Sequence, residues 1–355
     1  MSFSFGCRVN EAEKQLLDQN LLDAGFVWDE KNPAFYIINS CAITQKAERE
    51  VRQHIYQIRK KYPNTRILTT GCSATLWVKN NTKPTGADYW INNTDKKTIP
   101  DFICSLTTRP TYTQTDAKTP DKFLHSGKMM IKIQEGCNRF CSYCIVPYLR
   151  GTVKSEAISD IVKLIQQTKQ PIKEVVLTAI NTEAFGKDTG ETLIQLLEAI
   201  LQHTKIERVS FGSIHPWSIT DEFLTWYKTN KDNPRFVHFF HIPIQSGSDT
   251  ILRLMNRQYT TDELLKRLNQ LYNIDPHALL ATDVIVGFPG EGEKEFEETY
   301  QFLEQSPISK FHVFRYSPRP GTAASKMKYE PTPQKKRERS QKLIELGKKK
   351  MKLTT

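Results

Sequence analysis

A regular alternation of short apolar runs with helical patterns begins at Lys128 and restricts the fold of this chain more than any other feature. The expected strands are 129–134, 174–180, 208–214, 237–244, 279–287 and 311–316. The helices expected between them are 155–169, 191–203, 219–229, 261–272 and 293–305. Strands that alternate with helices favour a parallel, barrel-like α/β sheet. Because six units are too few for the eight-stranded barrel, the pattern predicts an open, partial (β/α)6 barrel.

The first hundred residues repeat this alternation on a smaller scale. Residues 10–24 have the apolar spacing of an amphipathic helix, and Thr44 is placed to cap a second helix. Three short runs read as strands, at 34–39, 65–70 and 87–91. This pattern predicts a small parallel α/β domain. The organisation expected is an N-terminal domain at 1–106, a polar, threonine-rich linker at 107–127, a barrel domain at 128–325 and a basic C-terminal helix or tail at 326–355.

Composition narrows the class of protein further. The chain has no run of 18 apolar residues and no pattern of a signal peptide at its start, so the expected location is the cytoplasm. Its net charge of +11 fits either a polyanionic partner such as RNA or a basic surface that serves solubility. An odd number of cysteines, seven, in a reducing compartment favours metal binding over disulfides.

Cys137, Cys141 and Cys144 form the strongest chemical motif. Three thiolates within eight residues can wrap one loop around a metal centre, and thiolates suit zinc or iron–sulfur clusters. No Cys or His that could complete a zinc site follows closely. Three ligands with one open iron are instead what a catalytic 4Fe-4S cluster requires. The loop also follows the first strand of the barrel, and functional sites in such barrels lie at the carboxyl ends of strands.

Cys7, Cys41 and Cys72 form a second, more widely spaced set. Each follows an expected strand, and a short strand is possible at the chain start. The carboxyl ends of parallel strands meet at one edge of a sheet, so these three thiols could hold a second cluster there. The spacing alone is equally compatible with ordinary core cysteines.

Several segments resemble the methylthiotransferase family of radical S-adenosylmethionine (SAM) enzymes. The segment 136–151 (GCNRFCSYCIVPYLRG) is similar to the family's signature, and 6–13 (GCRVNEAE) resembles its N-terminal cysteine motif. Further similar segments are 39–44 (NSCAIT), 70–72 (TGC), 241–248 (HIPIQSGS), 255–257 (MNR), 282–291 (TDVIVGFPGE) and 316–322 (YSPRPGT). The start of the chain and residues 41–49 look most like the threonylcarbamoyladenosine tRNA methylthiotransferases. Those enzymes add a methylthio group to C2 of a hypermodified adenosine beside the anticodon.

This resemblance implies the cofactors and their ligands. Cys137, Cys141 and Cys144 would hold a 4Fe-4S cluster that cleaves SAM to a 5′-deoxyadenosyl radical, and the other three cysteines would hold a second 4Fe-4S cluster that delivers sulfur. Residues expected to contact SAM are Tyr143, Asn181, Ser213, His215, Gln245, Ser246, Ile285 and Gly287. The partners implied are the anticodon loop of a tRNA, which could enter the space between the domains, and an electron donor such as a flavodoxin or ferredoxin.

The chain departs from the family pattern in two respects. Most members end in a small TRAM-type β-barrel that binds RNA, whereas only 33 residues with a helical pattern follow Thr322, so we expect that barrel to be missing. His215 stands where members of the favoured subgroup more often carry an acidic residue. The alternatives are a methylthiotransferase acting on isopentenyladenosine in tRNA or on a ribosomal protein, and a non-catalytic iron–sulfur protein that binds RNA or senses redox state. The sequence leaves the oligomeric state open.

Overall fold

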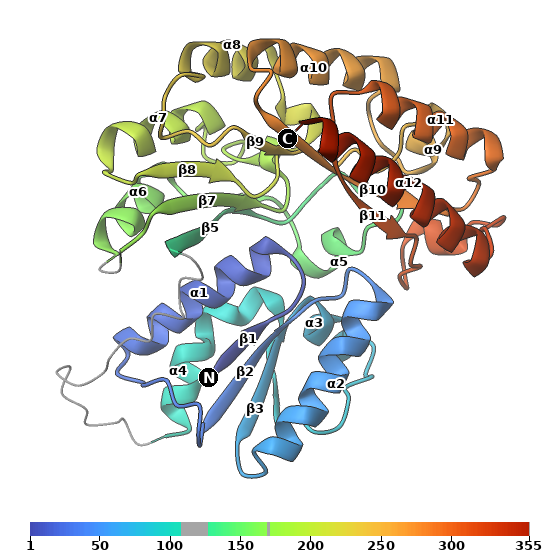
Figure 1. The fold of residues 1–355 in the computed structure, drawn as a ribbon. Helices are drawn as coiled ribbons and strands as arrows, with labels where there is room; N and C mark the ends of the chain where they lie inside the picture. Colours follow the sequence, from blue (N-terminus) through green and yellow to red (C-terminus); the bar gives the residue numbers. More distant parts are fainter. Residues whose placement is uncertain (108–126, 169–170, 355) are drawn as a thin grey trace.

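The computed structural model describes residues 1–107, 127–168 and 171–354, which fold into two α/β bodies that lie one against the other (Figure 1). We call residues 1–107 the N-terminal domain and residues 127–354 the barrel domain. The linker expected at 107–127 lies almost entirely outside the described residues. The domain limits expected from the sequence therefore stay a prediction.

The N-terminal domain is built on one parallel sheet of four strands in sequence order: β1 (Ser2–Ser4), β2 (Phe35–Ser40), β3 (Arg66–Gly71) and β4 (Tyr89–Trp90). Its helices are α1 (Arg8–Asp23), α2 (Gln45–Lys61), α3 (Cys72–Lys79), η1 (Asn93–Thr98) and α4 (Ile99–Ser105). The side chain of Thr44 accepts a hydrogen bond from the backbone N–H of Ala47 at 3.1 Å, so the predicted helix cap is confirmed. The small parallel α/β domain expected from the sequence is also confirmed.

The barrel domain has six parallel strands that follow the order of the chain. They are β5 (Lys128–Glu135), β7 (Glu174–Ala179), β8 (Arg208–Phe211), β9 (Phe239–His241), β10 (Leu279–Val286) and β11 (Lys310–Arg315). A parallel bridge between Val209 and Phe236 links β8 to the segment before β9, and a short strand β6 (Lys154–Ser155) pairs antiparallel to β5. The six strands expected from the sequence are all present, which confirms the partial barrel.

Helices cover the outer face of these six strands (Figure 1). The short helices of the domain are α5 (Val146–Arg150), η3 (Thr182–Ala184), η4 (Pro216–Ser218), α9 (Asp249–Leu254) and η5 (Ala323–Lys326), and α5 lies at the boundary with the N-terminal domain. The helices that cover the outer face are α6 (Ile158–Gln167), α7 (Leu193–His203), α8 (Asp221–Asn230), α10 (Thr261–Ile274), α11 (Glu293–Gln305) and α12 (Pro333–Thr354). One apolar core runs from Ile131 on β5 to Val286 on β10 and includes the inward faces of these helices. Within the described ranges, no helix is long and apolar enough to span a membrane.

The C-terminal helix α12 packs along β11 (Figure 1). Leu343 and Leu346 are buried in the barrel core. Arg339, also buried, forms an ion pair with Glu291 at 2.7 Å. The basic residues on the other face stay exposed, among them Arg337, Lys342, Lys348, Lys349 and Lys352. The helix thus completes the barrel domain on one side and presents a positive stripe to solvent on the other.

Candidate cofactor site between the domains

Cys7, Cys41 and Cys72 lie at the carboxyl edge of the N-terminal sheet. Cys7 follows β1 and immediately precedes α1, Cys41 directly follows β2, and Cys72 is the first residue of α3 after β3. Parallel strands bring these three positions to one edge, as the sequence pattern predicts. Gly6 has a φ of +86°, and a Cβ on it would lie 2.4 Å from Cys41 Sγ, so only glycine allows this approach.

The electrostatics of this trio confirm that the thiols are neighbours. Burial, followed by the neighbouring thiols of Cys7 and Cys72, raises the pKa of Cys41 to about 12. Burial also raises the pKa of Cys7, while Arg150 opposes the rise. Cys41 and Cys72 are buried, and none of the three forms a disulfide. Three close, free thiols shielded from bulk water fit the donor set of an iron–sulfur cluster.

Cys137, Cys141 and Cys144 lie on the loop between β5 and α5. The backbone N–H of Cys144 donates to the carbonyl of Cys141 at 2.9 Å, which folds the loop into a tight turn. Burial, together with the neighbouring thiols of Cys141 and Cys137, raises the pKa of Cys144 to about 12. The entry to the loop is fixed by Gly136 at φ +72°, where a Cβ would meet the carbonyl oxygen of Thr152 at 1.9 Å. This second trio of free thiols also fits a cluster.

An apolar cluster that crosses the domain boundary connects the two trios. Ala42, Cys72 and Leu76 of the N-terminal domain pack against the buried side chains of Ile145 and Leu149. Ile145 directly follows Cys144, and Ala42 directly follows Cys41. The chain segments that carry the two trios are therefore in contact, and helices α3 and α5 meet at this boundary (Figure 1).

Arg150, at the end of α5, is the centre of a buried hydrogen-bond network that includes residues of both domains. Its Nε lies 3.3 Å from Cys72 Sγ, and its terminal nitrogens bind Asn10 at 2.7 Å, Glu13 at 2.9 Å and Glu135 at 2.7 Å. Burial opposes its charge, but Cys72 and the two carboxylates outweigh burial and raise its pKa well above the usual value. The network positions a permanent cation beside the Cys7, Cys41 and Cys72 trio.

Lys96 and Lys132 extend this network on the side of Glu13. Lys96 forms an ion pair with Glu13, and Lys132 binds Glu13 at 2.9 Å and also pairs with Glu135. Although burial raises the pKa of Glu13, the three surrounding cations bring it well below its ordinary value. Glu13 is thus a buried anion held by cations from both domains.

Three residues after strands β7 and β8 form a compact group at the carboxyl end of the barrel. The indole N–H of Trp217 donates to Asn181 Oδ1 at 3.0 Å, and the rings of Trp217 and His215 stack with centroids 5.5 Å apart. Burial, followed by the charge of Arg257, lowers the pKa of His215 to about 3, so its imidazole is neutral at physiological pH. The buried amide nitrogen of Asn181 has no hydrogen-bond partner among the described residues, which leaves a donor free for a ligand.

Two guanidinium groups also contact the indole ring of Trp217. Arg139 and Arg257 each lie 4.4 Å from the ring centroid. Arg257 also donates to the Pro243 carbonyl at 2.7 Å and lies 3.7 Å from Cys141 Sγ. Tyr143 lies partly buried near the same group, and desolvation raises its pKa while Arg257 opposes the rise. The structure therefore brings Tyr143, Asn181 and His215 together around the Cys137, Cys141 and Cys144 loop.

The remaining expected SAM contacts have other partners in the structure. Ser246 is fully buried and bonded to Thr299 Oγ1 at 3.1 Å, and Ser213 Oγ lies 2.8 Å from His241 Nδ1. The backbone N–H of Gly287 donates to Glu291 at 2.7 Å.

Gln245 and Ile285 form one backbone pair beside these residues. The N–H of Ile285 donates to the carbonyl of Gln245 at 2.8 Å. Gln245 has a φ of +73°, a conformation that non-glycine residues adopt rarely. A parallel bridge between Gln245 and Val284 also ties this turn to β10, so the backbone conformation of the pair is fixed.

Sequence reasoning did not single out Arg150, Glu13 or Trp217 as site residues. Arg150 and Glu13 stand inside the two segments quoted for the family resemblance, and that was the only signal available for them. Nothing in the sequence around Trp217 distinguishes it from a core aromatic.

Comparison with known protein families agrees with this architecture. Residues 131–303 match the model of the radical SAM superfamily, and residues 2–92 match that of an uncharacterized protein family, UPF0004. Among solved structures, the radical SAM methyltransferase TsrM from Kitasatospora setae is similar with a TM-score of 0.58 at 12% identity, covering 88% of this chain and 68% of that one. The cobalamin-dependent radical SAM enzyme OxsB is similar with a TM-score of 0.52 at 13% identity, covering 98% of this chain and 54% of that one. These likenesses concern the fold. Together, the partial barrel and its three-cysteine loop define a radical SAM enzyme.

Curated relatives narrow the class. The threonylcarbamoyladenosine tRNA methylthiotransferase MtaB of Thermotoga maritima is 36% identical over 97% of this chain and 81% of its own length. The protein of the same name from Bacillus subtilis is 33% identical over 97% and 79%. The tRNA-2-methylthio-N(6)-dimethylallyladenosine synthase of Fervidobacterium nodosum is 33% identical over 91% and 77%. This chain belongs to the methylthiotransferase family of radical SAM enzymes. Its cofactors are those of the family, SAM and 4Fe-4S clusters.

Proposed function

We propose that this enzyme adds a methylthio group to C2 of threonylcarbamoyladenosine beside the anticodon of tRNA. The observation that carries the proposal is the contact, across one domain boundary, between chain segments that belong to two trios of free cysteines. Two of the relatives described above are named for this modified nucleoside, and they align with nearly the whole chain.

The two trios take different roles in this proposal. Cys137, Cys141 and Cys144 hold the cluster that binds SAM, since their loop lies at the carboxyl end of the barrel. Cys7, Cys41 and Cys72 hold the second cluster, where sulfur is delivered. When bound, these groups supply the electron that cleaves SAM to the 5′-deoxyadenosyl radical, and the sulfur that is transferred.

The residues of the barrel position SAM. The free amide N–H of Asn181 is available to an oxygen of SAM, and Tyr143 offers an aromatic surface near the cysteine loop. His215 stays neutral, so it neither repels the sulfonium of SAM nor exchanges a proton with it at neutral pH. Ser213, Gln245, Ser246, Ile285 and Gly287 shape this site through the hydrogen bonds described above, and any contact they make with SAM is part of the proposal.

Arg150 acts on the second trio. Its guanidinium binds the thiol of Cys72 and two carboxylates without access to water, so it holds the domains in one relative position. A fixed cation beside three cysteines also stabilises their thiolate forms, which are the forms that ligate iron.

The tRNA reaches the site from the side of the domain boundary. The net charge of +11 favours association with RNA. The exposed lysines and arginine of α12 add a positive stripe on the barrel domain. An adenosine extruded from the anticodon loop can then enter between the domains, where both trios lie. The reducing electron comes from a donor such as a flavodoxin or ferredoxin.

A second candidate substrate is the dimethylallyl-modified adenosine of tRNA. The relative from Fervidobacterium nodosum carries that name at 33% identity, close to the value for the relatives named for threonylcarbamoyladenosine. Overall identity therefore does not separate the two nucleosides, and the choice has to rest on residues that meet the substituent of the base.

Mass spectrometry of tRNA nucleosides tests the proposal directly. The gene is expressed in a host that lacks its own methylthiotransferases, and nucleosides are compared with and without it. Appearance of a methylthio form of threonylcarbamoyladenosine is the expected result. A methylthio form of the dimethylallyl nucleoside alone would favour the second candidate. No new tRNA nucleoside, with soluble protein that holds both clusters, would indicate a protein substrate.

A further inference from the structure

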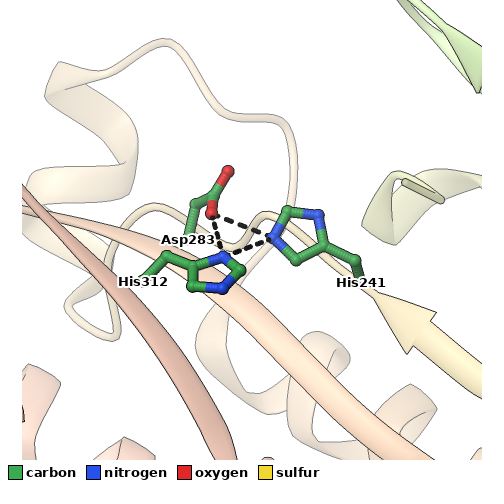
Figure 2. A group of neighbouring side chains, drawn as sticks. All are labelled: His241, Asp283 and His312. Carbon is green, nitrogen blue, oxygen red and sulfur yellow. Dashed lines mark hydrogen bonds and ion pairs between the residues drawn. The ribbon is translucent and has the colours of Figure 1, made fainter. Parts of the chain in front are cut away.

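A polar cluster lies inside the barrel on three neighbouring strands (Figure 2). His241 Nε2 is 2.9 Å from Asp283 Oδ1, and His312 Nδ1 is 3.2 Å from the same oxygen. Asp283 and His312 are register partners on β10 and β11, and His241 ends β9. Burial raises the pKa of Asp283, but the hydrogen bonds from the two histidines outweigh burial and bring it to about 2. Asp283 is therefore an anion inside the barrel.

Arg8 of the N-terminal domain reaches into the barrel next to this cluster. It is the first residue of α1, directly after Cys7, and its guanidinium donates to the carbonyl of Gly212. Gly212 leaves room for it, since a Cβ there would lie 3.2 Å from Arg8 Cδ. The next residue, Ser213, bonds His241 at 2.8 Å. Arg8 thus joins the segment that carries the Cys7, Cys41 and Cys72 trio to the polar cluster of the barrel.

Several polar atoms of this group remain available to a ligand. Among the described residues, Gly212 is the only acceptor for Arg8, whose guanidinium has five donors. The second carboxylate oxygen of Asp283, Oδ2, has no hydrogen-bond partner in the same part of the chain. An anion bound at Arg8 would accept hydrogen bonds from the donors that Gly212 leaves free.

We infer that Arg8, Asp283 and His312 bind the amino-acid substituent of the modified adenosine, with Arg8 taking its carboxylate and the Asp283–His312 pair its hydroxyl. This inference rests on the proposed function. A threonylcarbamoyl group carries both a carboxylate and a hydroxyl, and a guanidinium binds a carboxylate through two parallel hydrogen bonds. A dimethylallyl group carries neither, so it would leave these polar groups without partners. A site built around hydrogen bonds discriminates strongly against a ligand that lacks them.

A divalent cation is the competing occupant of the His241, Asp283 and His312 cluster. Their three donor atoms lie within 4.8 Å of one another. The nitrogen and oxygen ligands of a zinc ion lie about 2.0–2.1 Å from the metal and therefore about 3 Å from one another. The separations in this cluster, 2.9 to 3.3 Å, are similar. Arg8 argues against a metal, because its positive charge lies close enough to Asp283 for the two to interact. The hydrogen bonds from both histidines to Asp283 also hold the cluster together without an ion.

The test compares holoenzyme variants on three anticodon stem-loop RNAs. In each RNA the adenosine beside the anticodon carries one of three groups: threonylcarbamoyl, glycinylcarbamoyl or dimethylallyl. For each RNA we would measure kcat/KM for methylthiolation and Kd by fluorescence anisotropy. We expect wild type to prefer the threonylcarbamoyl RNA. Arg8→Gln should reduce the preference over the dimethylallyl RNA at least 10-fold, mainly through KM and Kd. Asp283→Asn should reduce the preference for the threonylcarbamoyl RNA over the glycinylcarbamoyl RNA, which lacks the hydroxyl.

A matched control is Arg66→Gln, which removes an exposed arginine at the opposite end of the N-terminal sheet and should keep the wild-type preferences. Unchanged preferences in Arg8→Gln, with wild type active on the threonylcarbamoyl RNA, would overturn the inference and leave the proposed function intact. Stoichiometric zinc in wild type that is lost in His312→Ala would overturn it as well. If wild type turns over none of the RNAs, the proposed function fails, and the ratio of the Kd values still decides whether the pocket reads the substituent.

Discussion

The Nε of Arg150 lies 3.3 Å from the Sγ of Cys72, and this contact joins the two domains where their cysteine segments meet. Arg150 comes from the barrel domain, six residues after Cys144, whereas Cys72 begins a helix of the N-terminal domain. One side chain therefore couples the geometry of the two trios. This relationship makes the domain boundary itself part of the site.

Replacing Arg150 by Gln should destabilise the protein and lower its second-cluster content. Removing the buried guanidinium breaks its ion pairs with Glu13 and Glu135 and leaves Lys96 and Lys132 as their remaining cations. Breaking a buried pair typically costs about 3–5 kcal/mol. Urea unfolding and the iron content after anaerobic reconstitution measure the two effects. Arg267→Gln, which removes an arginine paired with the exposed Asp221, should cost at most about 1 kcal/mol. Equal effects of the two variants would contradict the role given to Arg150.

The two cysteine trios should separate in function. Cys141→Ala should abolish 5′-deoxyadenosine formation from SAM, because it removes a ligand of the SAM-binding cluster. Cys41→Ala should keep that reaction and stop methylthiolation, since it removes a ligand of the sulfur-delivering cluster. Product analysis by liquid chromatography and mass spectrometry distinguishes the two outcomes. Cys104→Ala, a half-buried cysteine on α4, serves as the control and should retain both activities. Full methylthiolation by the Cys41 variant would refute this division of roles.

A further interdomain ion pair, between Arg319 and Glu48, should contribute to stability without affecting cluster content. Arg319 is buried and binds Glu48 at 2.6 Å, and Glu48 also accepts from the Trp77 indole. We expect Arg319→Gln to lower the free energy of unfolding by about 3 kcal/mol. The matched control is Arg52→Gln, because Arg52 binds the same carboxylate from a half-exposed position and should cost far less. Loss of iron in the Arg319 variant would show that the pair also shapes a cluster site.

Trp217 should matter for SAM through its hydrogen bond to Asn181. Trp217→Phe keeps an aromatic ring for the cation–π contacts but loses the N–H bond that orients Asn181. A net hydrogen bond of about 1 kcal/mol predicts a roughly 5-fold weaker Kd for SAM. Isothermal titration calorimetry of the anaerobic holoenzyme measures it. An unchanged Kd would mean that the Asn181 amide does not contact SAM.

His215 should make stability depend on pH in the mildly acidic range. Its folded pKa of about 3 lies below the unfolded value of about 6.5, so below pH 6.5 the unfolded chain binds a proton that the folded chain excludes. Stability is therefore complete above pH 6.5 and falls by about 1.4 kcal/mol by pH 5.5. Urea midpoints at pH 7.5 and 5.5 should show a smaller decrease for His215→Asn than for wild type. The same decrease in both proteins would mean that His215 is protonated in the folded state.

The strand–helix alternation by itself determined the partial barrel and the small N-terminal sheet, because apolar periodicity reflects which face of each element is buried. It also placed Cys7, Cys41 and Cys72 at strand ends, and the parallel arrangement of β1, β2 and β3 brings such ends to one edge. The Cys137, Cys141 and Cys144 loop was visible because its ligands are close in sequence.

Only the tertiary structure decided how the two domains meet. The contacts of Arg150 with Cys72 and Glu13, and of Arg319 with Glu48, join residues far apart in the chain, and no local pattern encodes such pairs. The same holds for the contacts of Trp217 with Arg139 and Arg257 and for Arg8 beside Asp283. Sequence periodicity reports burial along one element, whereas these contacts depend on the relative placement of elements from two domains, which packing across their boundary fixes.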